Sequence, residues 1–469
     1  MDGASSAEGE AFPDKFENLT RVGPGTPMGE LFRRFWLPAL LSSELTENDG
    51  TPVRIRILCE DLVAFRDTEG RIGIVSAYCP HKMAPLFFGR NEDCGLRCVY
   101  HGWKFDVEGK CVDIPNITPP DTYEELKEKA SIKGYPAREA GGMIWVYMGP
   151  KEHTPELPGM EWLDVSSEQL HVARWLHRSN WLQAAEGEID TSHISFLHSE
   201  LDSPSDGASA TTPASDETPA ITGLKLARDG APVITLHDTD YGFVYGSRRD
   251  LDDSYYWRIS QWMLPMWSAI PPPIDDFVGN GRAWVPIDDS HTMAFCYRYR
   301  TDRPFKQSEV DMLDSGMLFP PRTERRPYVL PHGYKIDAYV PTASFENDYF
   351  IDRERQKTKN FTGIWGVNEQ DRSLQEAMPN MPGHPPGIVD RSTEFLVKSD
   401  LPTMSARRIL TRLCKQLEQG QEPTKALEST QYGVRAISII SDIEEFDDFL
   451  KEYGNMGFAE VPSGKDSET

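Results

Sequence analysis

Two short segments of the chain each join a cysteine to a histidine: Cys79-Pro80-His81 and Cys98-Val99-Tyr100-His101. Two thiolates and two imidazoles suit a [2Fe-2S] cluster in which histidines replace two cysteines on one iron. That replacement raises the reduction potential to about −150 to +300 mV, from about −400 mV for an all-cysteine cluster of the plant type. We therefore predict that Cys79, His81, Cys98 and His101 hold a cluster that transfers single electrons.

Structural zinc uses the same donor atoms at a different spacing, with two nearby cysteines followed by two nearby histidines. Here each half supplies one cysteine and one histidine, so the zinc spacing fails. The other alternative is that His81 and His101 are ordinary surface or core histidines. Glycines around both segments argue against it, because they fit the turns of two short hairpins that close on a cluster.

A second candidate metal site lies in the segment NWLQAAEGEIDTSHISFLHSE, residues 180–200. His193 and His198 suit a 2-His-1-carboxylate triad, which leaves positions open on non-haem Fe(II). On a helix, Glu186, Asp190 and His193 would share one face. The five-residue step from His193 to His198 does not fit a regular helix, so we expect a bend or a π-type widening there. The alternative is an amphipathic helix whose histidines are merely hydrogen-bonded.

The run CPHKMAPLFFGRNEDCGLRCVYHGWKFDVEG resembles the N-terminal domain of Rieske non-haem iron aromatic-ring-hydroxylating oxygenases. The opening RVGPGTPMGELFRRFWLPALL is similar to the phthalate 4,5-dioxygenase group, which includes O-demethylases of lignin-derived aromatics. The likeness extends from about residue 15 to about residue 455. It implies an α+β chain: an all-β Rieske domain, then a helix-grip catalytic domain in which helices pack on an antiparallel sheet.

The resemblance also implies two carboxylate roles. GVNEQDRSLQEAM looks like the family's downstream ligand segment and puts Asp371 at the third iron ligand, with Glu369 and Glu376 in reserve. The alternative is a helix capped by Asn368, in which Asp371 lies in the first turn and is stabilised by the helix dipole. Asp190 would be a bridge between His193 and the cluster residue His101 of a neighbouring chain. Its alternative is a backbone hydrogen bond near a helix start.

The substrate pocket is predicted from strand alternation, which puts Arg249 on the same face as Tyr241, Phe243 and Tyr245. We expect Arg249 to hold a substrate carboxylate, with Arg248 or Arg258 in its place if the register differs. A flat apolar wall is expected from Tyr245, Trp257, Trp262, Met263 and Trp267. The alternatives are ordinary core aromatics and a solvated arginine at a hairpin end.

The resemblance implies the oxygenase component of a multicomponent enzyme. A separate NADH-dependent reductase with flavin and iron–sulfur groups would reduce the cluster, either directly or through a ferredoxin. O2 and an aromatic carboxylate such as phthalate would be the substrates. The alternative outcome is monooxygenation, including O-demethylation of methoxylated lignin-derived or diaryl aromatics. The expected assembly is a homotrimer or a dimer of trimers. Two hypotheses lie outside this class: a Rieske electron-transfer protein without mononuclear iron, and a helix-grip binding protein with a degenerate metal site.

Composition limits the partners and the compartment. The chain has 469 residues, of which 39% are hydrophobic, and a net charge of −25 that opposes nucleic-acid phosphates and anionic membranes. We expect neither as a partner, and we find no signal-peptide pattern and no apolar run long enough to span a bilayer. Seven cysteines without a signal sequence predict reduced thiols in the cytoplasm.

The expected organisation follows from caps, stripes and composition. We predict an N-terminal arm and helix over 1–40, a Rieske domain over 41–150 and a catalytic domain over 151–455. Thr26 should cap the first helix, with Leu31, Phe32, Phe35 and Trp36 as its buried stripe. A flexible insertion is expected at 201–220, which is nearly free of large apolar residues, and a disordered tail at 456–469, where the end of the chain is small and acidic. Strands are predicted at 241–250, 255–267 and 291–300, and two late helices carry Ile409 to Leu417 and Ile443 to Leu450.

Overall fold

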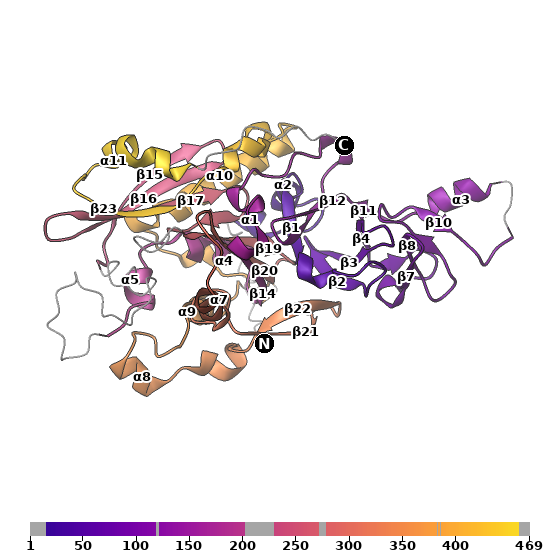
Figure 1. The fold of residues 1–469 in the computed structure, drawn as a ribbon, viewed down its shortest axis with the longest axis horizontal. Helices are drawn as coiled ribbons and strands as arrows, with labels where there is room; N and C mark the ends of the chain where they lie inside the picture. Colours follow the sequence, from indigo (N-terminus) through magenta and orange to yellow (C-terminus); the bar gives the residue numbers. More distant parts are fainter. Residues whose placement is uncertain are drawn as a thin grey trace, which may run out of the picture.

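The computed structural model describes residues 16–118, 122–201, 229–271, 278–381, 383–384 and 386–458. Short strands form one lobe, at the right of Figure 1, and a large sheet with helices forms the other. The predicted insertion at 201–220 and tail at 456–469 lie outside the described residues, apart from residue 201 and residues 456–458. Among the described residues, no helix is both long and apolar enough to cross a membrane.

The N-terminal lobe is built from small antiparallel sheets, in agreement with the all-β domain that the resemblance implies. Their strand orders are β11-β4-β3-β2, β10-β9-β8-β7, β1-β13-β12 and β5-β6. The strands are β1 (Trp36–Leu41), β2 (Val53–Ile57), β3 (Glu60–Arg66), β4 (Ile72–Ser76), β5 (Tyr78–Cys79), β6 (Ala84–Pro85), β7 (Arg90–Glu92), β8 (Gly95–Arg97), β9 (Lys104–Phe105), β10 (Cys111–Asp113), β11 (Gly134–Tyr135), β12 (Ala137–Ala140) and β13 (Met143–Tyr147). Helix α3 (Tyr123–Lys129) lies beside β10.

The second lobe is organised by one antiparallel sheet in the order β14-β20-β19-β18-β17-β16-β15, with β23 also paired to β17. Its strands are β14 (Leu170–His177), β15 (Val233–Thr239), β16 (Gly242–Asp250), β17 (Tyr255–Met263), β18 (Trp267–Ala269), β19 (Val278–Pro286), β20 (Thr292–Arg300) and β23 (Ile437–Ser441). A separate hairpin joins β21 (Thr323–Val329) and β22 (Lys335–Pro341). The three strands expected from the sequence are therefore present in one sheet.

Helices surround this sheet, which gives the expected α+β architecture. They are α4 (Trp181–Ile189), α5 (Ile194–Leu197), α7 (Gln307–Asp314), α8 (Arg353–Thr358), α9 (Val367–Gln375), α10 (Leu401–Glu418) and α11 (Phe446–Tyr453). In Figure 1, α10 and α11 lie along the top of the strands β15 to β17, and α7 and α9 lie below. Phe446 and Phe449 of α11 pack on Trp257 of β17, so that face of the sheet is buried as well.

The N-terminal helix is shorter than predicted. After α1 (Glu17–Thr20), α2 covers only Pro27–Phe32, and Thr26 Oγ1 caps it by accepting a hydrogen bond from Gly29 N at 3.2 Å. Trp36 is buried as expected but begins β1 rather than continuing the helix. The cause is tertiary: β1 pairs with β13, and this pairing outweighs a helical spacing of apolar residues.

The two lobes share one hydrophobic core. Trp145 of β13 stacks on Trp162 at 6.0 Å and on Trp267 of β18 at 5.4 Å between ring centroids. Backbone groups join the lobes too, because Leu58 N and Cys59 N donate to the carbonyls of Pro286 and Ile287. Arg174 of β14 binds Glu44 at 2.7 Å, with 2% and 0% of their side chains exposed. The lobes are therefore fixed to each other by packing and by a buried ion pair.

We expect Glu44→Ala to lower the free energy of unfolding by about 3–5 kcal/mol, because it leaves the guanidinium of Arg174 buried without its carboxylate. Asp238→Ala is the matched control, since its pair with Arg408 is exposed and is worth about 0–1 kcal/mol. Urea unfolding followed by tryptophan fluorescence measures both. Equal shifts for the two variants would contradict the structural role of the buried pair.

Candidate metal centres and cavity

The four predicted cluster residues come together at the tips of two turns. Cys79 ends β5, and a bond from Met83 N to Cys79 O at 2.9 Å closes its turn. Cys98 follows β8, and Gly102 N bonds Cys98 O at 2.9 Å in the second turn. The two thiols are buried, and the rings of His81 and His101 lie 4.4 Å apart between centroids. The two hairpin tips thus converge as the sequence predicted.

The chemistry of these residues fits a metal cluster. Among the described residues, Nδ1 of His81 is buried and has no hydrogen-bond partner, which is the situation of a ligand nitrogen. Trp103 stacks on the His81 ring with centroids 4.7 Å apart and shields it. Burial raises the pKa of the Cys79 thiol to about 11, so a thiolate at this position needs a metal cation beside it.

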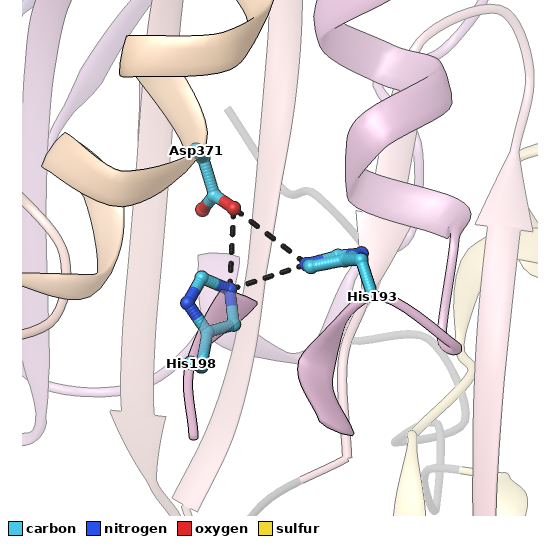
Figure 2. Close-up of side chains that lie close together, drawn as sticks. All are labelled: His193, His198 and Asp371. Carbon is cyan, nitrogen blue, oxygen red and sulfur yellow. Dashed lines mark hydrogen bonds and ion pairs between the residues drawn. The ribbon is translucent and has the colours of Figure 1, made fainter. Parts of the chain in front are cut away.

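The second candidate site has the geometry of a metal triad (Figure 2). His193 Nε2 and His198 Nε2 lie 3.1 Å apart, and Asp371 Oδ1 lies 3.6 Å from the first and 3.2 Å from the second. Two ligands that stand at right angles on a metal, each about 2.1 Å from it, are themselves about 3 Å apart. The three atoms therefore suit three mutually adjacent positions around one ion, which leaves the opposite positions open.

The backbone that carries the two histidines differs from the prediction. We expected one helix bent or widened between His193 and His198, but α4 ends at Ile189 and α5 begins at Ile194. Asp190 is the residue after α4, with an extended backbone (φ −74°, ψ 115°). Glu186 does not share a face with the site, because it binds Arg407 at 2.6 Å. The break, rather than a π-bulge, turns both imidazoles toward Asp371.

Each imidazole is oriented by a hydrogen-bond partner on its other nitrogen. His198 Nδ1 lies 2.7 Å from Gln370 Oε1, and Gln370 Nε2 donates in turn to Ile364 O at 3.0 Å. His193 Nδ1 lies 3.5 Å from Asp190 Oδ2. Burial works against ionisation of Asp190, but hydrogen bonds from His193 and Ser192 outweigh it and hold its pKa at about 2. Nothing in the sequence singled out Gln370.

Asp371 lies inside α9, whose N-cap is Gly366 and not Asn368. The capping alternative for Asp371 is therefore wrong. Burial opposes ionisation of Asp371, but the charges of His198 and His193 outweigh it and lower its pKa. The reserve candidates Glu369 and Glu376 do not belong to the triad that the described residues form.

A cavity of about 190 Å³ opens beside the triad. Sheet residues form part of its wall, and the linker before α7, α7 itself and the segment after it supply an apolar part through Phe305, Met312, Leu313, Leu318 and Phe319. Its charged lining residues include Glu188, Arg258, Arg282 and Arg298. Arg282 is neutralised by an ion pair with Glu188. This combination of apolar wall and cationic groups suits an aromatic ring that carries an anionic group.

The predicted substrate residues divide by face of the sheet. Tyr245 lines the cavity as expected. Trp257 and Arg248 lie on the opposite face, where Trp257 packs under α11 and Arg248 donates to Glu444 O at 2.8 Å. The prediction for these two residues is wrong. Both faces of this sheet are covered, so an aromatic residue in a strand does not indicate which face borders the cavity. Among the other predicted aromatics, Trp267 belongs to the core between the lobes.

Arg249 is on the cavity side but does not line the cavity within the described part of the chain. It is fully buried and donates to Thr191 O at 2.6 Å, so it supports the loop between α4 and α5. Arg258, which pairs across β16 and β17 with Ser247, lines the cavity instead. Burial, and then the charge of Arg258, lowers the pKa of Arg249 to about 10.

Comparison with known proteins agrees with this geometry. The model of the Rieske [2Fe-2S] domain matches residues 35–135, and that of the LigXa C-terminal domain like family matches residues 146–448. The chain belongs to the Rieske non-haem iron oxygenases. It therefore combines a Rieske cluster domain with a catalytic domain for mononuclear iron and O2, as the resemblance implied.

Two curated relatives cover most of the chain. It is 39% identical over 433 residues to the 3-chlorobenzoate-3,4-dioxygenase oxygenase subunit of Comamonas testosteroni, covering 89% of this chain and 92% of that protein. It is 36% identical over 414 residues to the phthalate 4,5-dioxygenase oxygenase subunit of Pseudomonas putida, covering 87% of each. The crystal structure of dicamba monooxygenase bound to dicamba has the same fold, with a TM-score of 0.53 and 14% identity over 83% of this chain and 99% of that one.

Proposed function

We propose that this Rieske oxygenase component hydroxylates an aromatic carboxylate. The observation that carries the proposal is Arg258, a buried arginine that lines the cavity next to the triad. Its hydrogen-bond partner is a phenol: Nη1 donates to Tyr256 OH at 3.3 Å, and no carboxylate of the described residues pairs with it. A buried guanidinium of this kind is stabilised by an anionic substrate. Both relatives are named for acidic aromatic substrates, which supports the same class.

In this proposal each site residue has one task. Cys79, His81, Cys98 and His101 hold the cluster, and His193, His198 and Asp371 hold the mononuclear iron. When bound, these groups supply single electrons and activation of O2 at open coordination positions. Gln370 and Asp190 fix the imidazole nitrogen that faces the metal, Arg258 orients the substrate by its carboxylate, and the apolar wall with Phe319 excludes water from the ring.

Asp190 is proposed as the contact between neighbouring chains. Its side chain is 31% exposed while one oxygen faces His193, so it can accept a second imidazole from outside. In Figure 1, β7 and β8 lie at one end of the long axis, whereas α5 and α9 lie in the opposite half. Such separation favours an electron path from the His101 of a neighbouring chain through Asp190, and with it a homotrimer or a dimer of trimers.

The partners follow from the same scheme. Both relatives are named as oxygenase subunits, so their activities involve further components. For this chain we propose an NADH-dependent reductase with flavin and iron–sulfur groups as electron donor. All seven cysteines are free of disulfides, which fits the reducing cytoplasm.

Metal analysis tests the proposal directly. The purified protein should contain about three iron atoms per chain, two of them in the cluster. His198→Ala should lose about one iron and all oxygen uptake, because the triad loses one of its three ligands, and should keep the visible and EPR spectra of the reduced cluster. His237→Ala is the control, since that histidine lies at an exposed pair with Asp447. A wild-type protein with a cluster but no further iron would make it an electron-transfer protein instead.

Removal of Arg258 tests the substrate class. Arg258→Ala should raise the KM for phthalate or 3-chlorobenzoate about 10- to 100-fold, because a charge-assisted hydrogen bond contributes about 1.5–3 kcal/mol. The KM for chlorobenzene should change little. Arg248→Ala, on the opposite face of the sheet, serves as the control. Equal losses for charged and uncharged substrates would count against a carboxylate contact. Product analysis with a methoxybenzoate distinguishes ring hydroxylation from O-demethylation.

Asp190→Asn tests the bridge. The amide keeps the shape but removes the charge that holds both imidazoles, so NADH-driven turnover should fall about 10- to 100-fold while iron content stays normal. Stopped-flow absorbance should show a cluster that is reduced normally and reoxidised slowly by O2 and substrate. Wild-type reoxidation rates in this variant would refute an electron path through Asp190.

A further inference from the structure

Glu376 is a buried carboxylate that joins three parts of the chain around the triad. It follows α9, five residues after Asp371, and only 1% of its side chain is exposed. Arg372 donates to both of its oxygens, at 3.0 and 3.2 Å. The backbone N of Arg178, just after β14, donates at 3.0 Å, and the hydroxyl of Tyr349 donates at 2.5 Å. The carboxylate therefore accepts four hydrogen bonds from three segments.

The segment that supplies Tyr349 has an unusual backbone. Asp348, Tyr349 and Phe350 are three successive non-glycine residues with positive φ, at 48°, 52° and 52°. L-residues rarely adopt this left-handed conformation, so the surrounding contacts must hold it. The turn buries Tyr349 and leaves Phe350 in solvent, and the ring of Tyr349 lies 5.5 Å from the guanidinium of Arg372. This backbone conformation therefore places the hydroxyl of Tyr349 where it donates to Glu376.

The same network continues into the loop after β14. Arg178 makes a two-pronged ion pair with Glu346, at 2.7 and 2.8 Å, in the short helix that contains Tyr349. Gln183 of α4 donates to Gln375 O at 2.8 Å, which ties the end of α9 to the helix that precedes Asp190. The C-terminal end of α9 is therefore fastened on two sides, one turn beyond Asp371.

We propose that Glu376 is a positioning residue for the mononuclear iron: through Arg372, Arg178 and Tyr349 it fixes α9 so that the Asp371 carboxylate stays within ligand distance of both histidines. This inference rests on the proposed role of His193, His198 and Asp371 as iron ligands. In this proposal the strained turn at residues 348–350 helps to position a metal ligand, although none of its residues belongs to the triad. Burial opposes ionisation of Glu376, but the charge of Arg372 outweighs it and keeps the carboxylate charged, with a pKa of about 2.

The test compares metal affinity with fold stability in wild type and three variants, and His198→Ala is added as the control for the ligand set. Glu376→Gln removes the charge, Tyr349→Phe removes one hydroxyl, and wild type is the reference. Tyr299→Phe is the matched control, because Tyr299 is equally buried and donates to Glu161 Oε2 at 2.7 Å on a different part of the sheet. Each protein is freed of mononuclear iron with a chelator and titrated with Co²⁺, whose EPR signal is read while the cluster is oxidised and therefore EPR-silent. Urea midpoints are measured on the same samples.

We expect Glu376→Gln to raise the dissociation constant of Co²⁺ about 10- to 100-fold, and Tyr349→Phe to raise it about fivefold. The EPR line shape at saturating Co²⁺ should change in both, because the Asp371 oxygen moves relative to the histidines. Tyr299→Phe should lower the urea midpoint as much as Tyr349→Phe does, with wild-type affinity and line shape. If Glu376→Gln does not fold, Tyr349→Phe carries the comparison.

The two ways to fail are distinct. If Tyr349→Phe and Glu376→Gln bind Co²⁺ with wild-type affinity and line shape, the positioning role is wrong and the iron site stands. If His198→Ala binds Co²⁺ as tightly as wild type does, the proposed ligand set itself is wrong, and the role of Glu376 falls with it.

Discussion

The close approach of three ligand atoms is the constraint on which the rest of this structure depends. Two imidazole nitrogens and one carboxylate oxygen lie within 3.6 Å of one another in a largely buried site. A buried carboxylate is costly unless it is paired, and imidazoles held this close repel each other once protonated. Such an arrangement persists only if the segments that carry it are held from outside. Buried hydrogen bonds hold the loop between α4 and α5, and others hold the end of α9.

The polar groups differ in what they hold. Gln370 fixes one ring, Asp190 fixes the other, and Arg249 supports the loop between them by donating to Thr191 O. Arg258 is the exception, because it faces the cavity and has only a phenol as its partner among the described residues. A chain with an overall charge of −25 thus keeps an uncompensated positive group next to its reactive centre. In an acidic protein, a positive group at this place supports the proposed anionic substrate.

The sequence predicted the parts of this arrangement that depend on short spacings. The paired Cys and His segments and the two histidines of the second site are local patterns, and the structure brings each set together. Asp371 is far from the histidines in the chain, so only the resemblance could select it over Glu369 and Glu376. Strand alternation gave the correct face for Tyr245 and Arg249. Alternation could not predict that Arg249 donates to the carbonyl of Thr191 while Arg258 lines the cavity, because this depends on where α4 ends.

The errors have the same physical origin. Trp257 is one of the aromatic residues predicted to line the pocket, and Arg248 is predicted to replace Arg249 if the register differs. Both instead lie on the face of the sheet that α11 covers. Trp36 has helical spacing with Phe32, yet pairing with β13 makes it a strand. In both cases a segment distant in the sequence determines the structure, and the neighbouring residues alone do not indicate it.

The stacked indoles of Trp145, Trp162 and Trp267 have a consequence for the flow of electrons. They pack the two lobes against each other in one shared core, so a swing of the cluster domain away from the catalytic domain would break this contact between rings. Electron transfer by such a swing would therefore lose the burial of these rings, and the packing favours a relay in which the two lobes stay together.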